Sequence, residues 1–271
     1  MIWPGPASHG YKPVRIVRIQ RKPGATPLWG WLSGERAGLL DGSPFGEYRR
    51  QPADLAVDGL TLLAPVEPGK IICVGRNYAA HAAEHGSEVP ELPLLFLKPP
   101  SAVIGPGQTI RLPPQSSAVE HEGELGVVIG RRGRWITAEG APSHIFGYTV
   151  AHDVTARDLQ QIDDQWTRAK GFDTFCPIGP WIETELDPSD ALITCNVNGQ
   201  LRQMGSTRDM VFPVYELVAY ISSIMTLEPG DLILTGTPSG VGPLLDGDEV
   251  TIEIEGIGTL RNPVRAETVT R

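Results

Sequence analysis

The fold of this chain depends most on one stretch, Glu120-His121-Glu122-Gly123-Glu124-Leu125-Gly126-Val127-Val128-Ile129. Its second half is an unbroken run of small and branched apolar residues, which predicts a buried strand. Residues two apart in a strand point to the same face, so Glu122 and Glu124 should present their carboxylates side by side. Such a pair in a half-buried place needs a cation, and oxygen ligands favour Mg²⁺, Mn²⁺ or Ca²⁺ over zinc. The alternative is an exposed edge strand with a solvated acidic face. Glu120, on the same face, is either a third member of the acidic group or an exposed flank.

Length and charge restrict the class of protein. With 271 residues, the chain can form one large domain or a small domain followed by a larger one. The formal net charge of −9 argues against nucleic acid and anionic membranes as partners. No apolar run reaches transmembrane length, residues 1–10 lack a signal-peptide pattern, and the three cysteines have no C-x-x-C spacing. We therefore expect a cytoplasmic protein.

The distribution of short apolar runs predicts two units. Residues 14–19, 28–32 and 37–40 alternate with Pro/Gly turns, which indicates a small β-rich N-terminal domain over residues 1–64. Residues 65–271 would form the larger domain. Within it, Asn198-Gly199 between two alternating runs predicts a hairpin, and residues 213–225 carry the clearest apolar helical stripe. The sum is an α+β fold dominated by strands.

Other candidate site residues lie near the ends of predicted elements. His81 and Glu84 are three apart in a predicted helix and can touch, although such pairs are more often surface pairs without a function. Asp153 ends a strand, and Lys98, which ends another, would ordinarily be solvated. The loop Thr235-Gly236-Thr237-Pro238-Ser239-Gly240-Val241-Gly242 lacks the Gly-Lys-Ser/Thr ending of a P-loop. It could still offer backbone N–H groups and the Thr237 hydroxyl to a carboxylate.

Seven blocks in this order resemble the fumarylacetoacetate hydrolase family, especially its short acylpyruvase-like and isomerase-like members. They are Gly75-Arg76-Asn77-Tyr78, Phe96-x-Lys98-Pro99, Glu122-x-Glu124-Leu125, Asp153-Val154-Thr155-Ala156-Arg157-Asp158-Leu159-Gln160, Lys170-Gly171-Phe172-Asp173-Thr174, Thr235-Gly236-Thr237-Pro238-x-Gly240-Val241-Gly242 and Gly256-Ile257-Gly258-Thr259-Leu260. The resemblance covers the chain from about residue 65 onward. It implies a mixed β-sandwich roll, in a homodimer, preceded by a small N-terminal domain.

The resemblance also assigns roles to residues. It implies that Glu122, Glu124 and Asp153 bind one Mg²⁺ or Mn²⁺ and that Lys170 is the active-site lysine. It implies a dyad of His81 and Glu84, on a lid, that activates water. The positions that match substrate contacts in the family are Arg157, Gln160 and Thr237 and, more loosely, Arg76, Tyr78 and Lys98. His152 departs from the pattern, because asparagine is frequent before the metal-binding aspartate.

The reaction that the resemblance implies is less specific than the site. The expected substrates are 2,4-dioxo or 3-oxo acids that react through a metal-stabilised pyruvate enolate, by acylpyruvate hydrolysis or oxaloacetate decarboxylation. The same intermediate serves isomerisation of 2-hydroxyhepta-2,4-diene-1,7-dioate or 5-carboxymethyl-2-hydroxymuconate in aromatic catabolism. A third possibility is a metal-binding protein without catalysis. Fold alone seldom decides among such alternatives.

Overall fold

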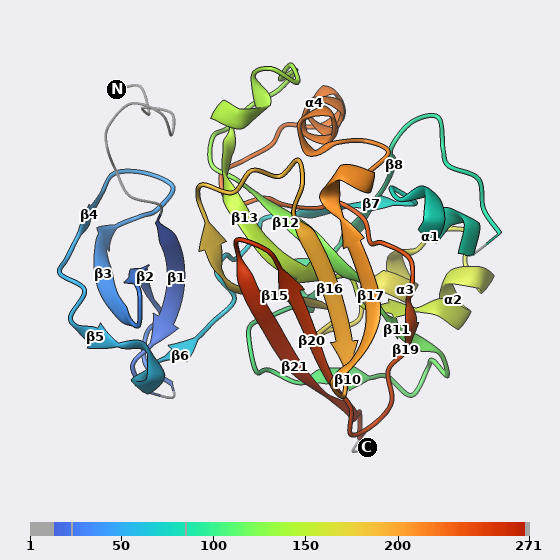
Figure 1. Ribbon diagram of the computed structural model, residues 1–271, viewed down its shortest axis with the longest axis horizontal. Coiled ribbons are helices and arrows are strands. Elements are labelled where there is room, and N and C mark those ends of the chain that lie inside the picture. Colours follow the sequence, from blue (N-terminus) through green and yellow to red (C-terminus); the bar gives the residue numbers. More distant parts are fainter. Residues whose placement is uncertain (1–13, 23, 85, 269–271) are drawn as a thin grey trace.

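The computed structural model describes residues 14–22, 24–84 and 86–268. Its first strands form a separate group at one side of the molecule (Figure 1). They are β1 (Arg15–Gln20), β2 (Leu28–Ser33), β3 (Arg36–Gly42), β4 (Tyr48–Arg50), β5 (Leu55–Ala56) and β6 (Thr61–Leu62). β1 pairs with β15 of the rest of the chain, so one sheet runs through both units. The boundary at residue 64 stays a prediction, and residues 1–13 of the first unit lie outside the described residues.

The large sheet continues from β1 through the centre of the molecule. Its order is β4-β3-β2-β1-β15-β13-β12-β18-β7-β8, with β5, β6 and β9 beside this path. Its other strands are β15 (Cys176–Glu183), β13 (Ile145–His152), β12 (Gly123–Ile129), β18 (Leu232–Leu234), β7 (Ile71–Gly75), β8 (Leu94–Lys98) and β9 (Val103–Ile104). β7 is parallel to β18, whereas β12 is antiparallel to both of its neighbours. The sheet is therefore mixed.

Two smaller sheets complete the β-sandwich roll. The five-stranded sheet contains β10 (Ile110–Leu112), β21 (Gly258–Ala266), β20 (Glu249–Ile254), β16 (Leu192–Val197) and β17 (Gln200–Ser206), in that order. The three-stranded sheet contains β14 (Thr155–Ala156), β11 (Val119–His121) and β19 (Gly242–Pro243). Asn198 and Gly199 both have positive φ, as a two-residue type I′ turn requires, and the predicted β16–β17 hairpin is confirmed.

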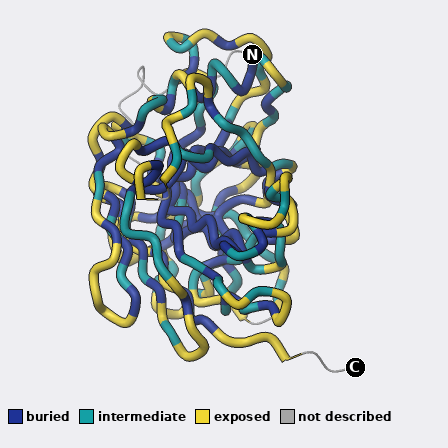
Figure 2. The backbone as a smooth tube through the Cα atoms, turned by 90° about the vertical axis from the view of Figure 1, so that its right-hand side faces the viewer, coloured by how far each residue is buried: buried dark blue, intermediate teal, exposed yellow. Residues whose placement is uncertain are grey.

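The core lies on both faces of the central strands. Leu125 and Val127 of β12 pack in a cluster with Ile193 and Ile252 of the five-stranded sheet. Val128 belongs to a second cluster on the opposite face. Every residue of β12 is buried, which is why the strand from Leu125 onward is a continuous apolar run rather than an alternation. The buried stretches gather along the middle of the molecule (Figure 2).

The α-helices in the described residues are few and short. They are α1 (Ala79–Glu84), α2 (Arg157–Ile162), α3 (Thr167–Lys170) and α4 (Val214–Ile224). The apolar stripe predicted for α4 is buried, with Pro213 directly before the first turn. None of the helices in the described residues is long and apolar enough to span a membrane. The fold is strand-dominated α+β, as the sequence predicts.

Candidate active site and metal centre

Three buried carboxylates meet where β12 begins and β13 ends. Glu124 is the second residue of β12, Glu122 immediately precedes this strand, and Asp153 immediately follows β13. The pairing of Gly123 with His152 sets the two strand ends side by side, and the Asp153 N–H donates to the Glu122 carbonyl at 2.9 Å. One carboxylate oxygen from each of the three acids lies within 4.8 Å of the others. The three predicted ligands are thus brought together.

The backbone that carries the acidic pair is not the continuous strand that the sequence predicts. The chain leaves β11 of the three-stranded sheet at Glu122 and enters β12 of the large sheet at Gly123. Glu122 lies at the junction between the two strands and Glu124 lies inside β12, and their carboxylates still converge. Glu120 is neither a member of the carboxylate cluster nor an exposed flank, because it accepts a hydrogen bond from Arg157 Nε at 2.7 Å.

Lysines compensate two of the three acids. Lys170 Nζ lies 2.8 Å from Glu122 and 2.7 Å from Asp153, and Lys98 Nζ lies 2.5 Å from Asp153. Burial opposes ionisation of Glu122, but the charges of Lys170 and Arg157 outweigh it and hold the pKa of Glu122 well below its usual range. Burial likewise opposes the Lys170 ammonium, but Asp153 and Glu122 raise its pKa to about 12. Glu122 and Lys170 are therefore both charged at neutral pH.

Glu124 is the acid with the least compensation. Its carboxylate accepts a hydrogen bond from the Gly236 N–H at 2.7 Å. Burial and the neighbouring Asp153 and Glu122 raise the pKa of Glu124 well above its usual value. A divalent cation among the three carboxylates would remove this penalty, and an all-oxygen donor set suits Mg²⁺ or Mn²⁺. The residues present therefore fit the metal that the sequence implies.

The loop after β18 packs against the segment that carries Glu122 and Glu124. The Thr237 hydroxyl donates to the Gly123 carbonyl at 2.9 Å and accepts from Gln203 Nε2 at 2.8 Å. Its proton is therefore engaged with the protein, and a hydrogen bond from Thr237 to substrate would have to come from the backbone N–H. Sequence reasoning missed Gln203. The one feature that could have identified it is that a polar residue occupies a buried position of β17, opposite Cys195.

The predicted lid lies over the centre. Glu84 accepts hydrogen bonds from the Gly240 N–H, at 3.2 and 3.1 Å to its two oxygens, so α1 is fastened to the loop after β18. His81 Nδ1 lies 3.7 Å from the Glu84 carboxylate. His81 is buried and lines the cavity, so this is more than the surface pair that its spacing alone would suggest.

A cavity of about 220 Å³ connects the lid with the carboxylates. The sequence-predicted residues that line it are His81, Arg76, Glu122, Glu124, Asp153, Arg157, Gln160, Lys170 and Thr237. Gln161 and Trp166, which sequence reasoning did not select, line it too. Arg157 contacts Glu120, Glu122 and Gln160 and forms part of the wall.

Two predicted substrate contacts lie outside this lining. Lys98 is 2% exposed and also donates to the Val154 carbonyl at 3.1 Å. It is therefore a buried ion-pair partner of Asp153 and is not solvated. Tyr78 is packed in the core, and its hydroxyl has no hydrogen-bond partner among the described residues. Burial, and secondarily Glu124, raise the pKa of Tyr78, which indicates that it lies near the carboxylates. Substrate contact by either residue stays a prediction.

His152 lies behind the metal centre. It is fully buried, and burial together with the nearby His121 lowers its pKa well below the usual value. It is therefore neutral at physiological pH and adds no positive charge beside Asp153.

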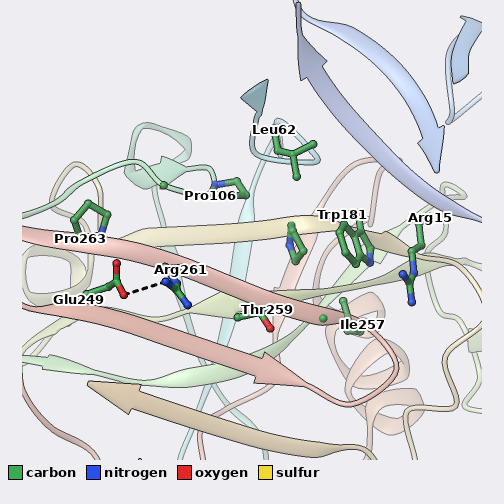
Figure 3. Close-up of a pocket in the computed structure, with 12 residues that line it drawn as sticks. Arg15, Leu62, Pro106, Trp181, Glu249, Ile257, Thr259, Arg261 and Pro263 are labelled. Atoms are coloured by element: carbon green, nitrogen blue, oxygen red, sulfur yellow. Dashed lines mark ion pairs between the residues drawn. The ribbon is translucent and has the colours of Figure 1, made fainter. Parts of the chain in front are cut away.

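A larger cavity, of about 740 Å³, lies between the N-terminal strands and β21 (Figure 3). Arg15, Leu62, Trp181 and Arg261 are among its lining residues. Arg261 is paired with Glu249 at 3.3 Å, and none of the predicted site residues reaches this cavity. The chemistry of the chain is concentrated in the smaller cavity.

Comparison with known proteins agrees with the geometry. Residues 70–265 match the family model "Fumarylacetoacetate (FAA) hydrolase C-terminal", and residues 14–65 match "Rv2993c-like, N-terminal". The mitochondrial oxaloacetate tautomerase FAHD2B of Bos taurus is 42% identical over 97% of this chain and 94% of its own. The crystal structure of a 2-hydroxyhepta-2,4-diene-1,7-dioate isomerase from Mycobacterium marinum has a TM-score of 0.87 at 45% identity, covering 94% of this chain and 100% of that one. That of a 5-carboxymethyl-2-hydroxymuconate delta-isomerase from Mycobacterium smegmatis has a TM-score of 0.85 at 47% identity, covering 93% and 100%. The chain belongs to the fumarylacetoacetate hydrolase family of enzymes.

Proposed function

We propose that this protein is a divalent-metal-dependent tautomerase or isomerase of 2-oxo dicarboxylates. The observation that carries the proposal is the convergence of Glu122, Glu124, Asp153, Lys170 and His81 on one cavity. Relatives named oxaloacetate tautomerase and diene-dioate isomerase support it, because both reactions move a proton through the enol form of a 2-oxo acid.

Each group has a defined task in this chemistry. A bound divalent ion would act as a Lewis acid on the 2-oxo group and favour negative charge on its oxygen. Lys170 gives two of its three N–H donors to Glu122 and Asp153, which leaves one for a substrate oxygen. His81 lines the cavity with Nδ1 3.7 Å from the Glu84 carboxylate, so its imidazole would accept a proton from a substrate carbon and return it to the substrate at a different atom.

The charges in the cavity favour a substrate with two carboxylates. With all groups ionised, Glu120 and the three ligand acids exceed Lys98, Lys170 and Arg157 by one negative charge, and a dication would reverse this to one positive charge. One substrate carboxylate would neutralise the centre. Of the arginine and lysine side chains that line the cavity in the described residues, Arg76 alone makes no ion pair, so it can receive a second carboxylate.

The backbone holds Arg76 in place. Its φ of 57° is in the left-handed region, which costs a residue with a side chain about 1–2 kcal/mol. The adjacent Asn77 opposes relaxation with three hydrogen bonds, two to Phe212 and one to the Thr235 carbonyl. A strained residue at a binding cavity is consistent with a functional position.

Arg76→Gln should raise the KM for oxaloacetate roughly 10–100-fold, because a charge-assisted hydrogen bond contributes about 1.5–3 kcal/mol. Inhibition by pyruvate, which has a single carboxylate, should change less than about twofold if it depends on the other residues. Steady-state kinetics would measure both constants, with the exposed Arg111→Gln as the matched control. Equal weakening of both ligands would contradict a second carboxylate subsite at Arg76.

His81→Gln should lower kcat about 10²–10⁴-fold, because it removes the proton-transfer group. Mn²⁺ affinity should stay within about twofold of wild type. The decay of enol-oxaloacetate absorbance, with Mg²⁺ or EDTA and a blank of metal without protein, would measure the rate. His144→Gln, which lies outside the cavity, is the control. An unchanged kcat in His81→Gln would exclude this residue as the proton carrier, and absence of metal-dependent tautomerisation in wild type would reject the proposed reaction.

The second candidate is acylpyruvate hydrolysis or oxaloacetate decarboxylation. The closeness of His81 and Glu84 favours hydrolysis, because such a pair can activate water. Pyruvate release from acetylpyruvate and from oxaloacetate, with Mg²⁺ and again with EDTA, separates these reactions from tautomerisation. The homodimer and the cytoplasmic location stay predictions.

A further inference from the structure

We propose that Gln203 is a positioning residue that couples the metal centre to closure of the lid. Gln203 lies in β17, outside the catalytic cavity, and is completely buried. It contacts no carboxylate of the triad, so its role is indirect. The inference rests on the metal centre of the proposed function.

The side-chain amide of Gln203 joins two segments that are distant in sequence. Its Oε1 accepts from the Gly123 N–H at 3.0 Å and lies 3.1 Å from His121 Nδ1. Its Nε2 donates to Thr237 Oγ1 and to the Pro238 carbonyl, both at 2.8 Å. An amide oxygen only accepts, so His121 must carry its proton on Nδ1. All four hydrogen-bonding positions of the amide are therefore used, which fixes its orientation.

These bonds form a closed ring with the chain between two metal ligands. Gly123 donates to Gln203, Gln203 donates to Thr237, and Thr237 donates to the carbonyl of the same Gly123. Gly123 lies between Glu122 and Glu124. The ring therefore sets the distance between the ligand-bearing strand and the loop after β18.

That loop contacts both functional parts of the site. Near its start, the Gly236 N–H donates to Glu124, and further along the Gly240 N–H donates to Glu84 of the lid. Gly240 has a φ of +95°, and a Cβ there would lie 2.2 Å from the Arg202 carbonyl, so the loop is pressed against β17. Without the Gln203 amide, the Gly123 N–H and the Pro238 carbonyl would lose their partners in a buried place. We infer that both the Glu124 contact and the Glu84 contact would then loosen together.

The near-isosteric Gln203→Met variant tests this coupling, with Gln200→Met of the same strand as the control because Gln200 is exposed. Mn²⁺ titration followed by electron paramagnetic resonance should show a Kd about tenfold higher in Gln203→Met, as is usual when a supporting group behind metal ligands is lost. Hydrogen–deuterium exchange of the metal-free protein should be faster at α1, although this helix is remote from residue 203 in sequence. The control should match wild type in both measurements.

Normal Mn²⁺ affinity and normal α1 exchange in folded Gln203→Met would overturn the inference, and a change in only one of them would reject the coupling. Should that variant fail to fold, Gln203→Glu keeps the acceptor for Gly123 and loses both donors to the loop. It should still accelerate α1 exchange, and normal exchange there would equally overturn the inference. If wild type binds no Mn²⁺, the proposed function fails, and α1 exchange in the metal-free variants still decides whether Gln203 holds the lid.

Discussion

Replacing Lys170 with methionine is expected to lower the free energy of unfolding of the metal-free protein by about 3–5 kcal/mol at pH 7, the usual cost of removing one partner of a buried ion pair. Lys170 is 2% exposed and lies between Glu122 and Asp153, so its loss removes the one cation that these two buried carboxylates share. Its pKa is raised to about 12, so its contribution is complete below the unfolded value of about 10.4 and is lost only as pH rises toward 12.

Mg²⁺ should restore part of that stability, because a dication can neutralise the same carboxylates, whereas activity should stay lost. Urea unfolding with Mg²⁺ and with EDTA would measure the effect. The control is Arg168→Met, which removes an exposed cation of the same helix and should leave the unfolding curve unchanged. A destabilisation that Mg²⁺ does not reduce would argue that Lys170 serves packing rather than charge balance.

Glu124→Gln is expected to stabilise the metal-free protein, whereas Lys170→Met destabilises it. At pH values above neutral, the melting temperature of Glu124→Gln should exceed that of wild type. The pKa of Glu124 is raised in the folded state by burial and by Asp153 and Glu122. Its contribution to stability is therefore greatest below the unfolded value of about 4.3 and is lost as pH rises toward the folded value. Glutamine has no charge to lose, so the variant should avoid this decline.

The affinity for metal should depend on pH in the opposite direction to the stability of the metal-free protein, because a bound cation requires the ionised Glu124 carboxylate. In wild type, Mn²⁺ affinity should increase with pH, and metal at 100 times its Kd should stabilise by about 2.7 kcal/mol. In Glu124→Gln this stabilisation should be absent. Thermal unfolding between pH 6 and 9, with and without metal, tests both statements, with the exposed Glu253→Gln as the control. Metal stabilisation that survives in Glu124→Gln would remove Glu124 from the ligand set.

Local sequence patterns were sufficient for the elements whose structure depends on neighbours in sequence. The two-residue turn at Asn198-Gly199 requires residues that tolerate positive φ, and the sequence supplies them. The stripe of α4 and the apolar run of β12 follow from side-chain periodicity. The order of the seven sequence blocks indicated the family, and the three acids that this resemblance assigns to the metal lie close together in the fold.

The partners of those acids could not be read from local patterns. Lys98 ends a strand, which usually means a solvated lysine, yet β8 pairs with β7 so that Lys98 is enclosed beneath Asp153. Glu120 alternates with Glu122 in sequence, and Arg157 contacts both, but Glu120 lies outside the carboxylate cluster. Alternation alone therefore did not decide which of these acids belongs to the cluster.

By itself, the sequence determined the strand-rich α+β class, the family and the three carboxylates that can bind a metal. Only the tertiary structure decided which cation neutralises which acid, that the Thr237 proton is engaged, and that Gln203 joins the ligand strand to the loop that holds the lid. The physical reason is the range of these interactions. Propensity and alternation act over a few residues, whereas the charge pairs and side-chain hydrogen bonds here join residues 17 to 114 positions apart, and only packing of the sheets brings such residues together.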